Sequence, residues 1–433
     1  MSYPCDFAMQ SHAPMNSISP TSVLLIAPHR SYRLAPFIDA ARKLGIHVLI
    51  ASEGEYSLVP DIASGIHIEF ANRQQALQRL LEVYQHTPYQ AVLGIDDFSV
   101  ALASEVAAQL GLRHNAVDAS HLTQRKDLAR ERLFDAGVNV PWHMTIDLRR
   151  VVTAQIKDAE YPLVLKPLSL SASRGVMRVN TLNEALKACE RIAAIAQDSD
   201  MRTELKTRLL AESFISGAEV AYEGLLNDGV LQQLAIFDKP DPLEGPFFEE
   251  TYYIAPSRHE KTLQQQIHAT VVQACEAYGL TNGPIHAELR IDAQNRVWVI
   301  EVAARTIGGE CARMLELATS QSLESVVLHQ ALGQPVEVSH ITGGAGVLMI
   351  PIPREGVLRR IEGVLAAQAV PYVEDVVFSI REGEKLVPLP EGGSYLGFIY
   401  ATAPTPAEAE QALRDAHACL NIVTVPYFPL LAG

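Results

Sequence analysis

The sequence predicts a protein of mixed class, in which an α/β domain is followed by α+β regions. Near the N-terminus, apolar runs alternate with helical patterns, an order that is typical of a parallel sheet covered by helices. Farther along, pairs of short alternating runs flank turn residues, which is typical of antiparallel hairpins. The 433 residues exceed what one hydrophobic core usually supports. We therefore expect an N-terminal α/β domain over residues 21–115, a central domain over 116–335 and a C-terminal α+β domain over 336–433.

The composition is that of a soluble globular chain, with 48% hydrophobic and 20% charged residues. The formal net charge of −15 gives no general attraction to nucleic acid or to an anionic membrane, so neither is an expected partner. The five cysteines show no CxxC spacing, which favours reduced thiols. Residues 1–20 lack the basic start and apolar core of a signal peptide, and no later apolar run is long enough to span a membrane. We interpret residues 1–20 as a mobile leader and expect a cytoplasmic protein.

Two strand–helix units open the first domain. An apolar run from Ser22 leads through a helical pattern over 34–44 to a second apolar run. A strand over 91–95 and a helix over 100–110, stopped by Gly111, form the next unit. No GxGxxG follows either strand, so a dinucleotide site is not indicated. We interpret this domain as a structural wall of a cleft.

The central domain is expected to begin with a helix over 126–136. A strand, a loop of small residues and a second strand follow within 161–179, and a helical pattern covers 182–197. A turn of Asn, Asp and Gly at 227–229 joins two further strands. In the C-terminal segment, short strands, glycine turns and a helical pattern over 406–419 indicate a small closing domain.

The most informative segment is residues 283–305 (GPIHAELRIDAQNRVWVIEVAAR), which alternates as two strands around a polar turn. A regular hairpin centred between Gln294 and Asn295 places Glu288 directly opposite Glu301. Like charges on directly opposed residues, whose Cβ atoms are about 5 Å apart, repel each other. A divalent cation such as Mg²⁺ between the carboxylates would remove this repulsion. The alternative is that both glutamates face solvent, because exposed antiparallel faces are normally polar.

Arg305 lies four residues beyond Glu301 on the same alternating face. Its guanidinium fork could hold a carboxylate or an acyl-phosphate oxygen near the metal, which makes it the first candidate for a catalytic residue. The following Gly308 and Gly309 would let substrate approach the backbone, although glycines after a strand also form ordinary turns. His286, on the face of Glu288, is a candidate for substrate contact or for a structural hydrogen bond.

Two lysines precede this hairpin. Lys126 opens a helix, and Lys166 ends an apolar run, where a buried cation needs an anionic partner. Nucleotide phosphates would suit both, and the alternative is that one is a surface lysine and the other forms a structural salt bridge. The loop at 167–175 (PLSLSASRG) could close over phosphates through backbone N–H groups. The stretch 212–215 could be a hinge that meets adenine, and the alternative is that its members are ordinary strand residues. The candidate residues of the loop and hinge are Ser171, Ser173, Gly175, Glu212, Ser213, Phe214 and Ile215, with Glu219 as a further acceptor.

Taken in order, these motifs resemble the ATP-grasp superfamily over roughly residues 115–335. The resemblance implies an ATP-grasp fold with an N-terminal Rossmann-like (pre-ATP-grasp) domain, a lid subdomain at about 142–211 and a small C-terminal closing domain. It also implies site roles. Lys126, Lys166 and the loop would bind the phosphates of ATP, residues 212–215 would line the adenine pocket, Glu288 and Glu301 would bind Mg²⁺ with Mn²⁺ as an alternative, and Arg305 would stabilise an acyl phosphate. The family usually has Asn two residues after the second acid, where this chain has Ala303, so the number of metal ions stays open.

The wording EVAARTIGG resembles the branch that contains L-amino-acid ligases. A segment at 237–259 is similar to a substrate-facing stretch of that branch, so Lys239 and Glu250 are expected either to address a substrate carboxylate and amine or to be salt-bridged surface residues. The C-terminal LGFIYATAPTPAEAEQAL resembles the closing domain of carboxylase-type ATP-grasp enzymes.

The resemblance implies a function as well as a fold. The expected protein is an ADP-forming ligase that activates a carboxylic acid as an acyl phosphate and joins it to an amine, with small-molecule substrates. A homodimer is common among relatives, although no interface pattern was found. The alternatives are a carboxylase-like or other ATP-grasp ligase with a different nucleophile, and a non-catalytic ATP-binding regulator.

Overall fold

The computed structural model describes residues 21–427 apart from residue 30, residues 54–63 and residue 200. The expected leader at residues 1–20 lies outside this range. Within the described part of the chain, no helix is both long and apolar enough to cross a membrane.

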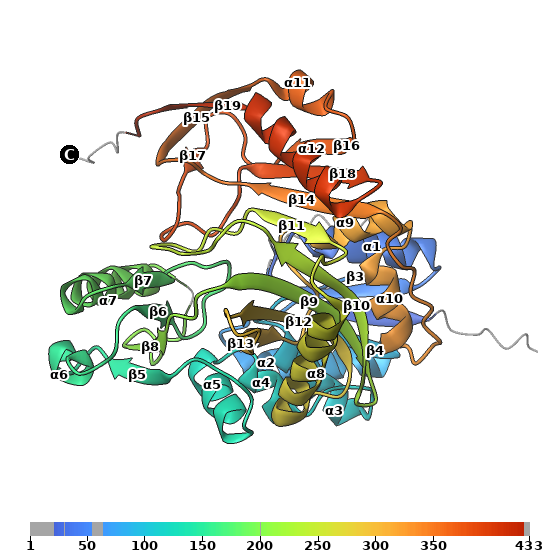
Figure 1. Cartoon of the computed structure of the whole chain (residues 1–433). Helices are drawn as coiled ribbons and strands as arrows, with labels where there is room; N and C mark the ends of the chain where they lie inside the picture. The colour runs from blue at the N-terminus through green and yellow to red at the C-terminus, as the bar shows by residue number, and fades with distance from the viewer. Residues whose placement is uncertain (1–20, 30, 54–63, 200, 428–433) are drawn as a thin grey trace, which may run out of the picture.

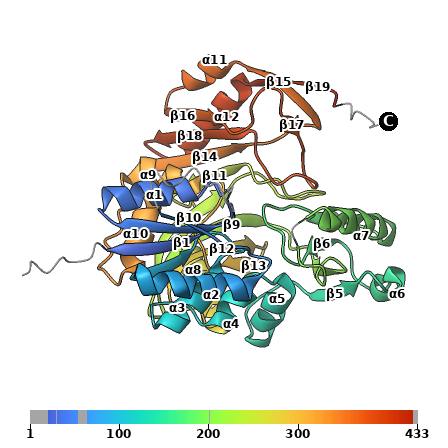
Figure 2. The same cartoon turned by 180° about the vertical axis from the view of Figure 1, so that it is seen from behind.

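The N-terminal domain contains a parallel sheet of four strands in the order β3-β2-β1-β4. The strands are β1 (Ser22–Ile26), β2 (His47–Ser52), β3 (Ser64–His67) and β4 (Ala91–Gly94). The helices, which flank the sheet in Figure 2, are α1 (Leu34–Lys43), α2 (Arg73–His86) and α3 (Val100–Leu110). Both predicted strand–helix units are confirmed. Gly111 ends α3 with a left-handed φ of 67°, which glycine adopts without strain.

The central sheet is antiparallel and has eight strands in the order β13-β12-β9-β10-β11-β14-β18-β16. The strands are β9 (Ala218–Asn227), β10 (Val230–Lys239), β11 (Tyr252–Ala255), β12 (Gly283–Ile291), β13 (Val297–Ala303), β14 (Gly344–Ile350), β16 (Val373–Phe378) and β18 (Gly397–Ala403). The last three belong to the C-terminal segment, which therefore continues the central sheet (Figure 1).

The C-terminal segment also forms a three-stranded sheet in the order β17-β15-β19. Its remaining elements are β15 (Gly356–Glu362), β17 (Lys385–Leu386), β19 (Asn421–Val425), α11 (Val364–Gln368) and α12 (Pro406–Cys419). The bounds of α12 confirm the helix predicted over 406–419. Its buried Ala412, Leu413 and Ala416 belong to the same hydrophobic cluster as strands β14 and β18.

A separate four-stranded sheet in the order β5-β8-β6-β7 projects from the centre of the molecule (Figure 1). Its elements are β5 (His143–Asp147), β6 (Leu163–Pro167), β7 (Met177–Val179), β8 (Arg208–Ser213), α6 (Val152–Ile156) and α7 (Leu182–Gln197). This unit has a hydrophobic cluster of its own, so it is held together independently of the central sheet. We call these elements the lid.

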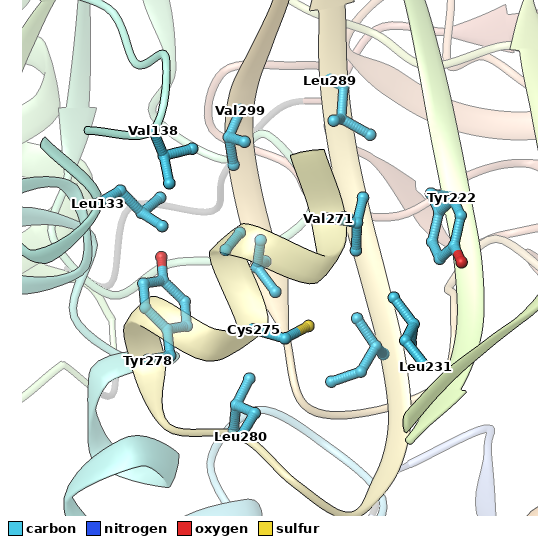
Figure 3. Close-up of a cluster of buried hydrophobic side chains, with 14 of the residues drawn as sticks. Leu133, Val138, Tyr222, Leu231, Val271, Cys275, Tyr278, Leu280, Leu289 and Val299 are labelled. Carbon is cyan, nitrogen blue, oxygen red and sulfur yellow. The ribbon is translucent and has the colours of Figure 1, made fainter. Parts of the chain in front are cut away.

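The predicted hairpin is built from β12 and β13, and a large core cluster covers one of its faces. Val271, Cys275 and Tyr278 of α8 (Lys261–Tyr278) pack towards Leu289 and Val299 of the hairpin (Figure 3). Because side chains alternate along a strand, this packing leaves the other face of the hairpin for polar residues. The remaining helices are α4 (Val117–Leu122), α5 (Lys126–Asp135), α9 (Cys311–Thr319) and α10 (Leu323–Ala331).

Candidate active site

A cavity of about 610 Å³ opens where the N-terminal domain, the lid, the central sheet and the C-terminal segment meet. Of the residues predicted for the site, all but Gly175 and Lys239 line it. Sequence reasoning missed the lining residues that come from the N-terminal domain and from the C-terminal segment. These are Tyr32, Arg33, Asp96, Asp97 and Phe98 from the N-terminal domain, and Ser394, Tyr395 and Phe398 from the C-terminal segment, among others.

Glu288 and Glu301 lie directly opposite each other on β12 and β13, as predicted. The assumed regular hairpin was wrong, however. Near the turn Ile291 pairs with Val297, one residue out of the predicted register, and a β-bulge before Glu301 restores the pairing. In a regular strand Glu301 would share the buried side of β13 with Val299. The bulge instead turns Glu301 into the cavity beside Glu288.

Both predicted lysines have carboxylate partners. Nζ of Lys126 lies 2.7 Å from Oε2 of Glu301, and Nζ of Lys166 lies 2.6 Å from Oε2 of Glu212. Glu212 is 1% exposed and also accepts a hydrogen bond from Arg130. Burial acts to raise the pKa of Glu212, but the charges of Arg130 and Lys166 outweigh it and lower that pKa to about 2. The two lysines are therefore fixed cations on the cavity wall.

The hinge residues Ser213, Phe214 and Ile215 follow directly from the lid strand β8 and line the same cavity. The ring of Phe214 carries the guanidinium group of Arg178 at 4.2 Å from its centroid. The carboxylate of Glu212 is paired with both Arg130 and Lys166 and is therefore not a free acceptor on the cavity wall. Val164, Leu243 and Ile300 add apolar side chains to the lining of the cavity.

A buried charge cluster lies next to Glu288. Nζ of Lys239 lies 2.8 Å from Glu219, 2.5 Å from Glu250 and 3.5 Å from Glu288. Lys239 is therefore salt-bridged, as in the alternative, but it is buried and not a surface residue. Burial acts to lower the pKa of Lys239, but the three carboxylates raise it well above its usual value. Arg290 pairs with Glu219 at 2.8 Å. Two cations thus face three carboxylates, and burial raises the pKa of Glu250 to about 7 despite the charge of Lys239.

Arg305 is held by a residue of the N-terminal domain. Its Nε donates to Oδ1 of Asp97 at 2.9 Å, and its Nη2 donates to Oδ2 at 3.1 Å. Nη1 donates to the carbonyl of Thr306 at 3.1 Å. A guanidinium has five N–H donors, so two remain for a ligand in the cavity. Asp97 has no local sequence signal that connects it to Arg305, and it was not predicted.

His286 lies between two carboxylates. Its Nδ1 is 3.6 Å from Glu223, and its Nε2 is 3.7 Å from Glu288. Burial acts to lower the pKa of His286, but these carboxylates outweigh it and raise that pKa above its usual value. Glu223 is fully buried and also accepts a hydrogen bond from the backbone of Ile307 at 3.1 Å. Glu223 therefore connects the histidine to the loop after Arg305.

That loop is fixed from two further sides. Arg33 donates to the carbonyl of Thr306 at 2.6 Å and to that of Ile307 at 2.8 Å. Gly309 has a left-handed φ of 61°, and a Cβ there would lie 1.9 Å from Cε of Met349. The backbone conformation at 309 favours glycine, and a larger residue would displace the side chain of Met349. The loop presents Gly308 and Gly309 to the cavity, as predicted.

Comparison with known proteins now identifies the central domain. Residues 159–314 match the ATP-grasp domain family, and residues 348–425 match the L-amino acid ligase C-terminal domain 2 family. This chain contains an ATP-grasp domain. The solved L-amino acid ligase from Bacillus licheniformis superposes with a TM-score of 0.78 at 25% identity, covering 94% of this chain and 99% of that one. The predicted fold class and the predicted relationship to L-amino-acid ligases are confirmed.

Curated relatives of this chain include two named enzymes. Alanine–anticapsin ligase of Bacillus subtilis is 25% identical over 54% of this chain and 52% of its own length. Dapdiamide A synthase of Enterobacter agglomerans is 26% identical over 59% of this chain and 60% of its own. Each match spans less than two thirds of the relative.

In the ATP-grasp domain, the loop between β6 and β7 contacts both the N-terminal domain and the C-terminal segment. Oγ of Ser171 donates to Oδ2 of Asp97 at 2.9 Å. On the other side, Nε of Arg174 donates to the carbonyl of Glu391 at 2.9 Å, and the N–H of Gly175 donates to the carbonyl of Pro390 at 2.9 Å. The loop is therefore closed against the N-terminal domain and the C-terminal segment in this structure.

Proposed function

We propose that this protein is an ATP-dependent carboxylate–amine ligase. It activates an amino acid at its carboxylate as an acyl phosphate and couples it to an amine, giving an amide or a dipeptide together with ADP and phosphate. The observation that carries the proposal is the cavity in which Arg305 presents free donors beside the opposed Glu288 and Glu301 and the fixed cations Lys126 and Lys166. The named relatives support the reaction class, because they are a ligase and a synthase and the similar solved structure is an L-amino acid ligase.

The donor set fits a divalent cation. Glu288 and Glu301 line the cavity from opposed positions, and oxygens of Glu219, Glu250 and Glu288 lie within 4.8 Å of one another. Mg²⁺ commonly uses one or two carboxylates together with phosphate oxygens and water. Glu288 and Glu301 would hold Mg²⁺, or Mn²⁺ in its place. Ala303 offers no side-chain oxygen. The bound ion would neutralise part of the negative charge of the phosphates.

The chain's own residues account for the two chemical steps by positioning and electrostatics. In the first step a carboxylate oxygen of the acid bonds to the γ-phosphorus of ATP and ADP leaves. Lys126 and Lys166 offset the negative charge of the phosphates. In the second step the amine nitrogen bonds to the acyl carbon, phosphate leaves, and the nitrogen gives up a proton. The two free donors of Arg305 are placed to bind the acyl-phosphate oxygens.

The proposal extends to the setting of the enzyme. Its partners are small molecules, and the homodimer expected from the family resemblance is retained as the proposed assembly. We propose a cytoplasmic location, which is supported by the free thiols of Cys189, Cys275, Cys311 and Cys419.

Phosphate release from ATP and Mg²⁺ against a matrix of amino-acid pairs tests the reaction class. We expect release that depends on amino acids, with a condensed product detected by mass spectrometry in the active mixtures. Release that depends on bicarbonate, with a carboxylated product, would support a carboxylase-like reaction instead. ATP binding without release across the matrix and a wider panel of acids and amines would support a regulator.

Replacing Glu301 with glutamine tests the metal assignment. We expect the Mg²⁺ concentration for half-maximal phosphate release to rise roughly tenfold or more, because the loss of even an outer-shell partner of a metal costs about 10- to 100-fold in affinity or activity. A Mg²⁺ titration at saturating ATP measures this. Glu316→Gln, at an exposed site on α9, is the matched control. An unchanged Mg²⁺ dependence in the Glu301 variant would remove Glu301 from the metal site.

A further inference from the structure

The N-terminal domain contributes one charged contact directly to Arg305. Both oxygens of Asp97 accept hydrogen bonds from Arg305, although the two residues are 208 positions apart in the sequence. A bidentate pair of this kind fixes the plane of the guanidinium as well as its position. The side chain of Arg305 is 11% exposed, and that of Asp97 is 22% exposed. The pair is therefore shielded from water, and its geometry is more strongly determined than that of a surface ion pair.

The turn that carries Asp97 is held by hydrogen bonds. It lies in the turn between β4 and α3, where the fully buried Ser99 accepts a hydrogen bond from the backbone of Asp96 at 3.1 Å and donates one to the carbonyl of Asp96 at 2.9 Å. The side chain of Gln124 donates to the carbonyl of Asp97. The carboxylate thus stands on a turn that is tied both to its own domain and to the segment that precedes α5.

The carboxylate of Asp97 also contacts the loop between β6 and β7, which the family resemblance assigns to phosphate binding and which we call the phosphate loop. Oδ2 of Asp97 accepts from Nη2 of Arg305 at 3.1 Å and from Oγ of Ser171 at 2.9 Å. The orientation of Arg305 and the closed position of the loop therefore share one anchor oxygen.

We infer that Asp97 is a positioning residue for the ligase reaction. It orients Arg305 so that the two remaining N–H donors point at the acyl phosphate, and it aligns them with the closed phosphate loop. This inference rests on the proposed function, since it assigns the N-terminal domain a part in the reaction of that same site.

A role for Asp97 as a proton acceptor from the amine does not fit the same contacts. Its burial acts to raise its pKa, but the charge and hydrogen bonds of Arg305, with smaller effects of Arg33 and Ser171, lower the pKa of Asp97 to about 2. A carboxylate with that pKa is a weak base near neutral pH. Both of its oxygens are also already engaged.

Asp97→Asn and Asp97→Glu separate positioning from charge. Asparagine keeps the shape of the side chain but turns an amide group towards the guanidinium, whereas glutamate keeps the charge but displaces it by one methylene. We expect kcat for amino-acid-dependent phosphate release to fall about tenfold or more in both variants, because misplacement by about 1 Å can cost 10²-fold. The KM for ATP and the thermal midpoint of Asp97→Glu should stay close to the wild-type values. Asp39→Asn, which removes an exposed aspartate–arginine pair from the same domain, should leave kcat unchanged.

A double-mutant cycle with Arg305→Ala completes the test. If Asp97 acts through Arg305, Asp97→Asn should cause little further loss of kcat in the Arg305→Ala background. A loss of equal size in both backgrounds, full activity of either Asp97 variant, or a rise in the KM for ATP with unchanged kcat would overturn the assignment. If Asp97→Asn does not fold, Asp97→Glu decides by the same criteria. If the wild-type protein releases no phosphate in response to amino acids, that result contradicts the proposed function and not the role of Asp97. The two failures can therefore be told apart.

Discussion

Replacing Arg305 with alanine is expected to lower kcat by roughly 10²- to 10³-fold, the usual cost of removing one donor from a site that stabilises developing negative charge. The dissociation constant of ATP should stay within about twofold of the wild-type value, because Lys126, Lys166 and the hinge are untouched. Steady-state phosphate release and nucleotide titration by calorimetry measure the two quantities. The same loss of guanidinium also frees Asp97, so the thermal midpoint should be recorded for each variant.

Two further variants give this result its meaning. Arg305→Lys keeps the charge but cannot make the bidentate contact to Asp97, so most of the loss in kcat should persist. Arg296→Ala removes an exposed arginine from the tip of the same hairpin and should leave kcat unchanged. Wild-type turnover in Arg305→Ala would exclude this residue from the reaction.

Arg130→Ala is expected to destabilise the folded protein by about 3–5 kcal/mol, the range seen when one partner of a buried ion pair is removed. Arg130 donates to Glu212 and, at 2.6 Å each, to the carbonyls of Val299 and Ile300. Its loss leaves Glu212 with Lys166 alone and two backbone acceptors without their donor. Denaturant unfolding followed by tryptophan fluorescence suits this test, because Trp298 lies on β13 and the carbonyl of Trp142 accepts from the hinge.

A matched control lies on the same helix. Arg132 donates to the carbonyl of Ala277 at 3.3 Å from an exposed position, so Arg132→Ala should change the unfolding free energy by no more than about 0.5 kcal/mol. Equal unfolding midpoints for the two variants would contradict the importance of the buried network around Glu212.

The fold was predictable where the signal is local. The helices predicted over 182–197 and 406–419 have the bounds of α7 and α12, because a strong apolar stripe and a capping threonine mark them. Helix α2 was not predicted. Only Ala76 and Leu80 are buried along its 14 residues, so its apolar pattern is weak. Neither the extension of the central sheet by β14, β18 and β16 nor its strand order has a local signature, since both depend on pairing between distant segments.

For the candidate site as well, residues with a local sequence signal could be predicted and residues with distant partners could not. Glu288, Glu301 and Arg305 could be found because they lie in one short segment with a hairpin pattern, although a bulge and not simple alternation turns Glu301 to the face of Glu288. The pairing of Glu288 with Glu301 was predicted correctly for an incomplete reason, since the bulge that produces it has no glycine or turn residue to mark it. Asp97 and Arg130 were missed. Each acts on residues far away in the sequence, and an aspartate after a strand or an arginine within a helix is ordinary by itself.

The most direct test of the proposed reaction follows oxygen from the acid to phosphate. An amino acid labelled with ¹⁸O in its carboxylate is incubated with the enzyme, ATP, Mg²⁺ and the amine, and the products are analysed by mass spectrometry. Activation as an acyl phosphate predicts that one labelled oxygen appears in the released phosphate for each amide formed, while the second stays in the amide carbonyl. Label in AMP, or amide formation with unlabelled phosphate, would contradict the acyl-phosphate mechanism.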